Sequence, residues 1–119
     1  MGIAVRKFQD LTKYIALIPF VNYFETENKF VQDVYAFQDS HPEYNLERYN
    51  ELLEQNGLEW SANMCIADVS DKDAQCVLAL IVGAVRAERF CDGALRSFFE
   101  NGSIKKWLKR LLEIDEGDN

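Results

Sequence analysis

The sequence predicts an all-α fold: a single compact helical domain of about five to six helices around one buried central helix. Apolar residues recur at helical spacing in almost every segment. Only two prolines and six glycines interrupt the 119 residues, which favours long regular elements over many short strands. The run CVLALIVGAV, residues 76–85, has no polar face, as expected of a helix that is buried on all sides. The length is that of one domain, so we expect residues 1–119 to fold together.

Two amphipathic helices are predicted in the first forty residues. The apolar positions of the first are Phe8, Leu11, Tyr14, Ile15 and Ile18. Pro19 ends or bends this helix, because proline has no amide hydrogen to donate to the preceding turn. The second helix is expected over residues 26–37, with Thr26 as a candidate N-cap. Its apolar stripe consists of Phe30, Val31, Val34 and Phe37.

A third helix is predicted over residues 45–56, with Asn45 as its cap. Its apolar positions are Leu46, Tyr49, Leu52 and Leu53. Gly57 stands where a helix commonly ends on a left-handed glycine. Residues 58–70 show no clear period, and we expect a short extended piece that packs against the core.

The central helix is expected to start at Asp71, where Ser70 and Asp73 have the spacing of a capping box. Gly83, in the middle of the apolar run, indicates that a neighbouring helix approaches closely. An exposed glycine at that place would cost about 1 kcal/mol relative to alanine. Gly93 bends or interrupts the chain after this helix.

Two more helices are predicted after Gly93. The shorter one carries the apolar residues Leu95, Phe98 and Phe99. Gly102 ends it and Ser103 caps the next helix. The inward positions of this last, amphipathic helix are Ile104, Trp107, Leu108, Leu111 and Leu112. The acidic tail, residues 116–119, is expected to be frayed.

Charge and cysteine content exclude several functions. The net charge is −7 and neither half of the chain is basic, which argues against binding of a nucleic-acid duplex or an anionic membrane. The apolar run is too short to span a bilayer. No signal peptide and no C-x-x-C pair are present, so we expect a cytoplasmic protein with reduced thiols. One histidine and three scattered cysteines lack the spacing of a metal site, and no phosphate-binding loop occurs, so we expect no metal and no cofactor.

Three charged residues after the apolar run form the main candidate site: Arg86, Glu88 and Arg89. Both arginines continue helix faces that are buried one turn earlier, so each should find a carboxylate or carbonyl oxygen. Asp92 is a local candidate partner for Arg89. Glu88 leaves the helix nearly opposite Arg86, so one pocket holding all three side chains requires the helix to loosen near Gly93.

Three roles are open for this cluster. A buried ion-pair and hydrogen-bond network would fix how the last helices meet. Two guanidinium groups also suit a carboxylate or phosphate ligand. A catalytic Glu88 is the third role, but neighbouring arginines would favour its ionised form and make it a poor general base. Cys91 would act as a nucleophile only if the fold brought His41 beside it, so no catalytic residue is assigned.

The last helix carries a basic face that is a candidate partner surface: Lys105, Lys106, Lys109 and Arg110. Most such faces are simply solvated, and the alternatives are an acidic partner or RNA. Arg110 can instead pair with Glu113, three residues on. The other candidate partner surface is the aromatic group Phe20, Tyr23 and Phe24. These rings can instead belong to the core.

Residues 67–115 resemble an uncharacterised bacterial family. The family carries the pattern R-x-E-R-F-C-x-G-x-L after an apolar helix, then a glycine turn and a helix with W-L-x-R-L. Here the first pattern runs from Arg86 to Leu95, the turn contains Gly102, and the second pattern runs from Trp107 to Leu111. The resemblance implies a bacterial or mobile-element protein of the cytosol, and it implies no activity.

These observations favour a small, acidic, non-enzymatic interaction module that binds a protein partner or itself. The alternative is a small-molecule or anion-binding domain that uses a buried Arg–Glu–Arg cluster. The two hypotheses differ in whether Arg86, Glu88 and Arg89 line a pocket that solvent can reach.

Overall fold

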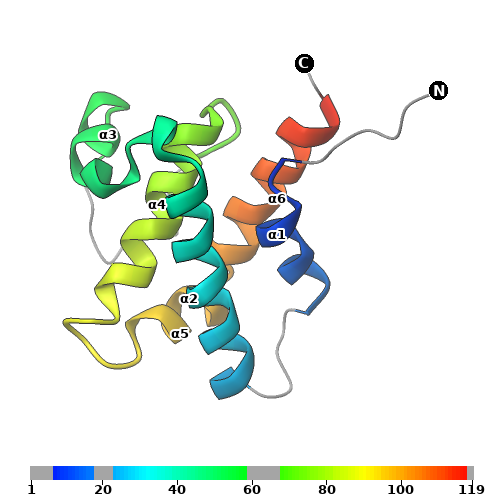
Figure 1. The fold of residues 1–119 in the computed structure, drawn as a ribbon, viewed down its shortest axis with the longest axis vertical. Coiled ribbons are helices and arrows are strands. Elements are labelled where there is room, and N and C mark those ends of the chain that lie inside the picture. The colour runs from blue at the N-terminus through cyan, green and yellow to red at the C-terminus, as the bar shows by residue number, and fades with distance from the viewer. Residues whose placement is uncertain (1–6, 18–22, 59–67, 118–119) are drawn as a thin grey trace.

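The computed structural model describes residues 7–17, 23–58 and 68–117 (Figure 1). The α-helices of this part are α1 (Gln9–Thr12), α2 (Tyr23–Ser40), α3 (Tyr49–Gln55), α4 (Ala74–Ala87), α5 (Ala94–Glu100) and α6 (Ser103–Gly117). Three 3₁₀ helices accompany them: η1 (Lys13–Leu17), η2 (Pro42–Tyr44) and η3 (Leu46–Arg48). The described residues contain no strand, which confirms the all-α prediction. None of their helices has both the length and the apolar character needed to cross a membrane.

The central helix is α4, as predicted. All ten residues from Cys76 to Val85, Gly83 included, are buried, and α4 contacts α2, α3, α5 and α6. Figure 1 shows it between α3 on one side and α6 on the other, with α2 in front. The helix begins later than expected, because Asp73 itself is the N-cap: its Oδ1 accepts a hydrogen bond of 2.9 Å from the amide of Cys76. The predicted capping box is therefore wrong, since Ser70 lies before the helix and donates its amide to Asp68.

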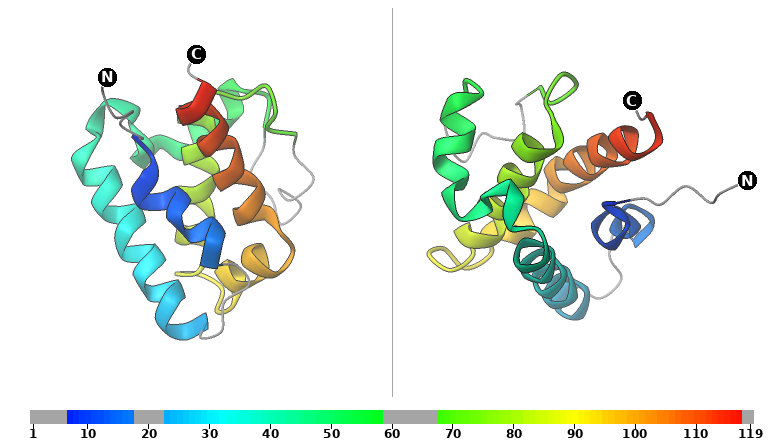
Figure 2. Two further views of the ribbon diagram at one scale, coloured as in Figure 1. Left: turned by 90° about the vertical axis from the view of Figure 1, so that its right-hand side faces the viewer. Right: turned by 45° about the horizontal axis from the view of Figure 1, so that its top comes forward.

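The first predicted helix is split into α1 and η1. Its buried side chains Phe8, Leu11 and Tyr14 are three residues apart, a period that a 3₁₀ turn keeps on one face. The left view of Figure 2 shows α1 between α2 and α6. The amide of Phe8 donates to Asp115 Oδ2 on α6 at 3.0 Å, and Tyr14 Oη donates to Asp33 Oδ2 on α2 at 2.6 Å. These two hydrogen bonds attach the N-terminal segment to α6 and to α2.

Helix α2 starts before the predicted cap, so Thr26 lies inside it rather than at its N-terminus. The predicted stripe faces the core: Phe30, Val34 and Phe37 are buried and Val31 is partly buried. Phe30 makes edge-to-face contacts with Tyr14 at 5.2 Å and with Phe99 at 5.1 Å between ring centroids. Aromatic contacts therefore connect η1, α2 and α5.

The third predicted helix is shorter than expected at its start. Asn45 adopts a left-handed conformation, makes no side-chain cap, and precedes η3, so its predicted capping role is wrong. The C-terminal prediction is confirmed. Gly57 has φ +77° and donates to the carbonyl of Glu54, while Leu58 donates to that of Leu53, the paired bonds of a Schellman motif.

The last two helices are confirmed, but the predicted cap at Ser103 is wrong. Gly102 has φ +87° and separates α5 from α6. Ser103 is the first residue of α6, and its amide donates to Asn101 Oδ1 at 2.9 Å. Residues 116–117, expected to fray, belong to α6. The predictions that involve Ile18, Pro19 and the extended piece near residues 59–67 lie outside the described residues.

Candidate functional site

The joint between α4 and α5 is a tight turn of residues 88–93. The amides of Arg89 and Phe90 donate to carbonyls three residues back, at 3.1 Å each, so the chain leaves the α-helical period at the end of α4. Gly93 then takes φ +88°, a left-handed conformation that favours glycine, and α5 starts. This turn projects from the body of the molecule at the lower left of Figure 1.

Glu88 holds this turn together. Its Oε1 accepts the amide of Leu95 at 3.0 Å and its Oε2 accepts that of Gly93 at 3.2 Å. A carboxylate at this place satisfies amides at the start of α5 that have no partner within the helix. Glu88 therefore links the end of α4 to the start of α5 through backbone hydrogen bonds and not through an ion pair with Arg86 or Arg89.

Arg86 is half-buried and lies apart from Glu88 and Arg89. Its guanidinium carbon stands 6.0 Å from the centre of the Tyr49 ring on α3, and its Nε is buried with no hydrogen-bond partner. This contact is at the limit of a cation–π interaction. The expectation of a carboxylate or carbonyl partner for Arg86 is therefore wrong for the buried Nε.

Arg89 is exposed, which corrects the prediction of a buried Arg–Glu–Arg cluster. The physical reason is the early end of α4 at Ala87. The turn that follows carries Arg89 away from the buried face that Val85 occupies. Within the described part of the chain, Arg89 makes no ion pair with Asp92.

Phe90 stands at the tip of the turn with 87% of its surface exposed. Its neighbour Cys91 is a free, exposed thiol. The hypothesis of a Cys–His pair has no support in the described residues, because His41 Nδ1 lies 3.1 Å from Glu43 and its ring packs on Phe37 and Tyr44.

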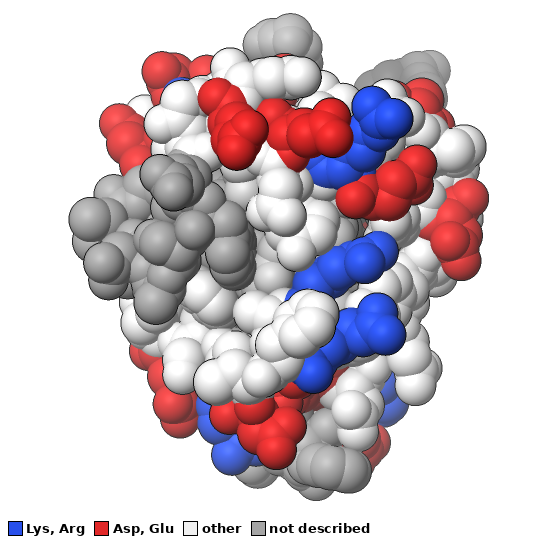
Figure 3. Space-filling view, turned by 90° about the vertical axis from the view of Figure 1, so that its left-hand side faces the viewer, with Lys and Arg blue, Asp and Glu red and all other residues white. Residues whose placement is uncertain are grey.

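Figure 3 views the face that carries α3 and this turn, where groups of both charges alternate with uncharged surface.

A cleft of about 710 Å³ lies between α2 and the α4–α5 turn. Its lining residues are Glu27, Asn28, Val31, Tyr35, Val85, Glu88, Arg89, Gly93 and Arg96. Two predicted site residues, Glu88 and Arg89, are thus brought together, and Arg86 is not part of the lining. Glu27 and Arg96 are not among the site residues that the sequence predicts. A signal for Glu27 was present, since it precedes Val31 and Tyr35 at intervals of four and so shares their helix face.

Glu27 is the acid that α2 contributes to this cleft. Its Oε1 is buried and has no hydrogen-bond partner. Burial raises the pKa of Glu27, the negative charge of Glu88 raises it further, and the positive charge of Arg96 opposes both. The cleft therefore holds a carboxyl group whose charge is incompletely compensated.

The basic face of α6 lines a second cleft, of about 430 Å³, together with Asp68, Ser70 and Glu113. Lys109 is exposed, whereas Lys105, Lys106 and Arg110 are half-buried. Arg110 is used for packing: its Nε donates to the carbonyl of Lys72 at 3.0 Å, and its Nη1 lies 3.3 Å from Glu113, the pairing expected from the sequence. The positive charge of this face is therefore partly compensated, which its sequence does not indicate.

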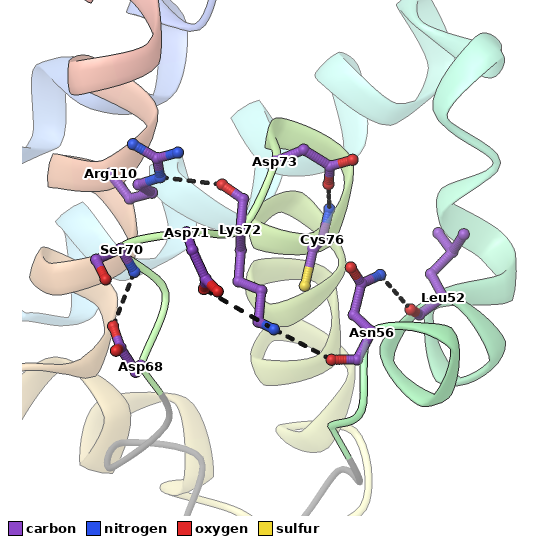
Figure 4. A network of polar contacts seen from close by, with 9 residues as sticks. All are labelled: Leu52, Asn56, Asp68, Ser70, Asp71, Lys72, Asp73, Cys76 and Arg110. Atoms are coloured by element: carbon purple, nitrogen blue, oxygen red, sulfur yellow. Dashed lines mark hydrogen bonds and ion pairs between the residues drawn. The ribbon is translucent and has the colours of Figure 1, made fainter.

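Figure 4 shows how Lys72 and Arg110 hold the segment before α4. Lys72 Nζ donates to the carbonyl of Asn56 at the end of α3, at 3.2 Å, while Arg110 reaches the same lysine from α6. Three elements that are distant in sequence are joined by this network. We infer that this hydrogen-bond network stabilises the fold. The described residues include no group of His, Cys, Asp and Glu side chains that could hold a metal ion.

The chain was also compared with known proteins. The model of a protein family of unknown function (DUF6508) matches residues 14–117, which include the α4–α5 turn and every residue of both clefts. No curated protein and no solved structure gives a significant match.

Proposed function

The chain belongs to the DUF6508 family, and we propose that it is a non-enzymatic interaction module that contacts a protein partner through the turn of residues 88–93. The observation that carries this proposal is the exposure of Phe90, at 87%. Leu17, at 50%, is the other large apolar side chain that the described residues leave open to solvent. Single exposed apolar residues are common, so the position of Phe90 in the molecule is more informative than its exposure alone.

The placement of Phe90 favours binding in two ways. Its turn is held by the two hydrogen bonds of Glu88, so little conformational freedom is lost when a partner covers it. Arg89 is exposed beside it, and both phenylalanine and arginine are enriched in protein interfaces relative to the rest of the surface. Burial of a phenylalanine ring contributes about 1.5–3 kcal/mol.

Replacement of Phe90 by alanine is expected to weaken partner binding at least tenfold while leaving the fold intact, because the ring makes its main contacts with the partner. The measurement is a pull-down from the native cell, followed by titration of each captured protein against the purified variants. Analytical ultracentrifugation tests a second copy of the chain as the partner. Leu17→Ala is the matched control and should bind as the wild type does. Equal binding of F90A and wild type, or no partner and no self-association at all, would overturn the proposal.

The basic face of α6 is proposed as a secondary contact for an acidic partner. Lys109 supports it, because it is exposed and lines the cleft together with the other three members of this face. The net charge of −7 still argues against nucleic acid as the partner. A bacterial, cytoplasmic setting belongs to the same proposal, and it rests on the sequence pattern of residues 86–95 and on cysteines without a disulfide or metal spacing.

A second candidate function is the binding of an anion or small molecule in the cleft between α2 and the α4–α5 turn. It is favoured by Arg89, whose exposed guanidinium group lines this cleft. We expect inorganic phosphate or acetate to raise the melting temperature of the wild type, and Arg89→Ala to remove that effect. Arg48→Ala is the control, since Arg48 is equally exposed but lies beside α3. Stabilisation that persists in R89A would contradict this function.

A further inference from the structure

The cleft between α2 and the α4–α5 turn combines two acidic and two basic side chains. Glu27 comes from α2, Glu88 and Arg89 from the turn, and Arg96 from α5. Their formal charges cancel when all four are ionised. The two carboxylates repel a simple anion, so they do not contribute to the binding of a ligand that carries only negative charge. The charge pattern therefore points to a ligand that carries both signs.

The two carboxylates are not equivalent. Both oxygens of Glu88 accept backbone hydrogen bonds, so this group is already used by the turn. Glu27 has a buried oxygen without a partner, which is an unfavourable state for a carboxylate. A cation in the cleft next to Glu27 would compensate the charge of this carboxylate.

The remaining walls suit a small organic body. Val31 and Val85 supply apolar surface, and Tyr35 adds a ring. The volume of about 710 Å³ lies within the range of about 300–1,000 Å³ that is usual for small-molecule sites. Arg89, which is exposed at the edge, offers a forked donor to a carboxylate.

We propose that this cleft binds a small zwitterion, an aminocarboxylate whose ammonium group lies against Glu27 and whose carboxylate pairs with Arg89. The inference rests on the second candidate function and names its ligand class. It does not use Phe90, which lies outside the lining of the cleft, but it shares Arg89 with the proposed partner contact.

The test is a titration of the ¹⁵N-labelled protein, followed by NMR, with 4-aminobutyrate, 5-aminopentanoate and 6-aminohexanoate. Butyrate and butylamine serve as probes that carry only one of the two charges. At least one aminocarboxylate should shift the amide signals of the cleft residues with an affinity at least tenfold above both single-charge probes. Glu27→Gln and Arg89→Ala should each reduce that affinity at least tenfold, while Glu54→Gln and Arg48→Ala, exposed residues outside the cleft, should not.

The outcomes separate this inference from the function on which it rests. If butyrate binds as well as the aminocarboxylates and E27Q has no effect, the zwitterion is excluded and a simple anion site remains. If no probe shifts the cleft signals up to millimolar concentration, both are overturned.

A stability measurement without ligand tests the state of Glu27 independently. The pKa of Glu27 is raised by its burial and by Glu88, and lowered by Arg96, while Arg89 is the remaining charged group of the lining. Between the ordinary and the raised pKa the folded protein binds more protons than the unfolded chain, so stability falls as pH rises through this interval. E27Q should abolish this fall and melt above the wild type at neutral pH. A lower melting temperature would show that the ionised carboxylate is already well compensated, and would overturn the proposed role of Glu27.

Discussion

Replacement of Trp107 by alanine is expected to lower the free energy of unfolding by about 3–5 kcal/mol. Trp107 is completely buried on the inner face of α6, and its ring lies 5.8 Å from that of Phe98. The substitution removes the largest side chain of the core where α5 and α6 meet, and the neighbours can only partly close the cavity. A domain of this size has a total stability of about 5–15 kcal/mol, so W107A should be close to unfolding. Urea denaturation at 25 °C gives the measurement.

Trp107→Phe provides the interpretable variant if W107A does not fold. The indole Nε1 is buried and has no hydrogen-bond partner, a state that costs about 1–3 kcal/mol. Phenylalanine removes this unsatisfied donor and leaves a much smaller cavity than alanine, so we expect less than half of the loss. A W107F protein as unstable as W107A would contradict this explanation, because it would mean that the donor is satisfied.

Replacement of Glu88 by alanine is expected to reduce the free energy of unfolding by about 2 kcal/mol. The change removes the two hydrogen bonds to Gly93 and Leu95 and leaves the start of α5 without its acceptor. Since these bonds also fix the turn, E88A should weaken any partner contact of Phe90 although Phe90 is still present. Denaturation and the binding titration with F90A as reference measure the two effects.

The control for E88A is Glu100→Ala, an exposed acid at the end of α5, which should change stability by less than about 0.5 kcal/mol. Glu88→Gln should fall between E88A and the wild type, because an amide retains one acceptor oxygen but its NH₂ group cannot accept the second bond. If E88A and E100A were equally stable, the assignment of Glu88 to the joint would be wrong.

The sequence predicts the helices correctly where a local pattern is compatible with only one structure. The run of residues 76–85 has no polar side, so burial on all sides was its simplest outcome, and α4 is indeed the central helix. Gly57 and Gly102 were recognised as helix ends because positive φ angles favour glycine. The predicted caps at Thr26, Asn45, Ser70 and Ser103 are wrong, because Ser, Thr, Asn and Asp can all cap a helix and the local pattern does not select among those near a helix start.

The candidate site was predicted only in part. Continuation of the helical period placed Arg89 on a buried face, but α4 ends at Ala87, so the extrapolation failed within one turn. The structure places two of the candidate residues, Glu88 and Arg89, in the lining of the cleft. The helical period places Glu27 on the face of Val31 and Tyr35, but neither this spacing nor the position of Arg96 shows that a cleft opens there, because the cleft is formed only when α2 packs beside the α4–α5 turn.

The sequence by itself determined that this protein is an all-α domain with a buried central helix, since periodicity and the positions of glycine depend on interactions within one or two turns of the chain. The tertiary structure decided how the charged residues are grouped. The tertiary structure places Glu27 from α2 in the same cleft lining as Glu88 and Arg89. Arg86 lies near Tyr49 and outside this lining. The physical reason is that side chains from different helices meet only through the packing of those helices, and their order and angles are not encoded in any local period.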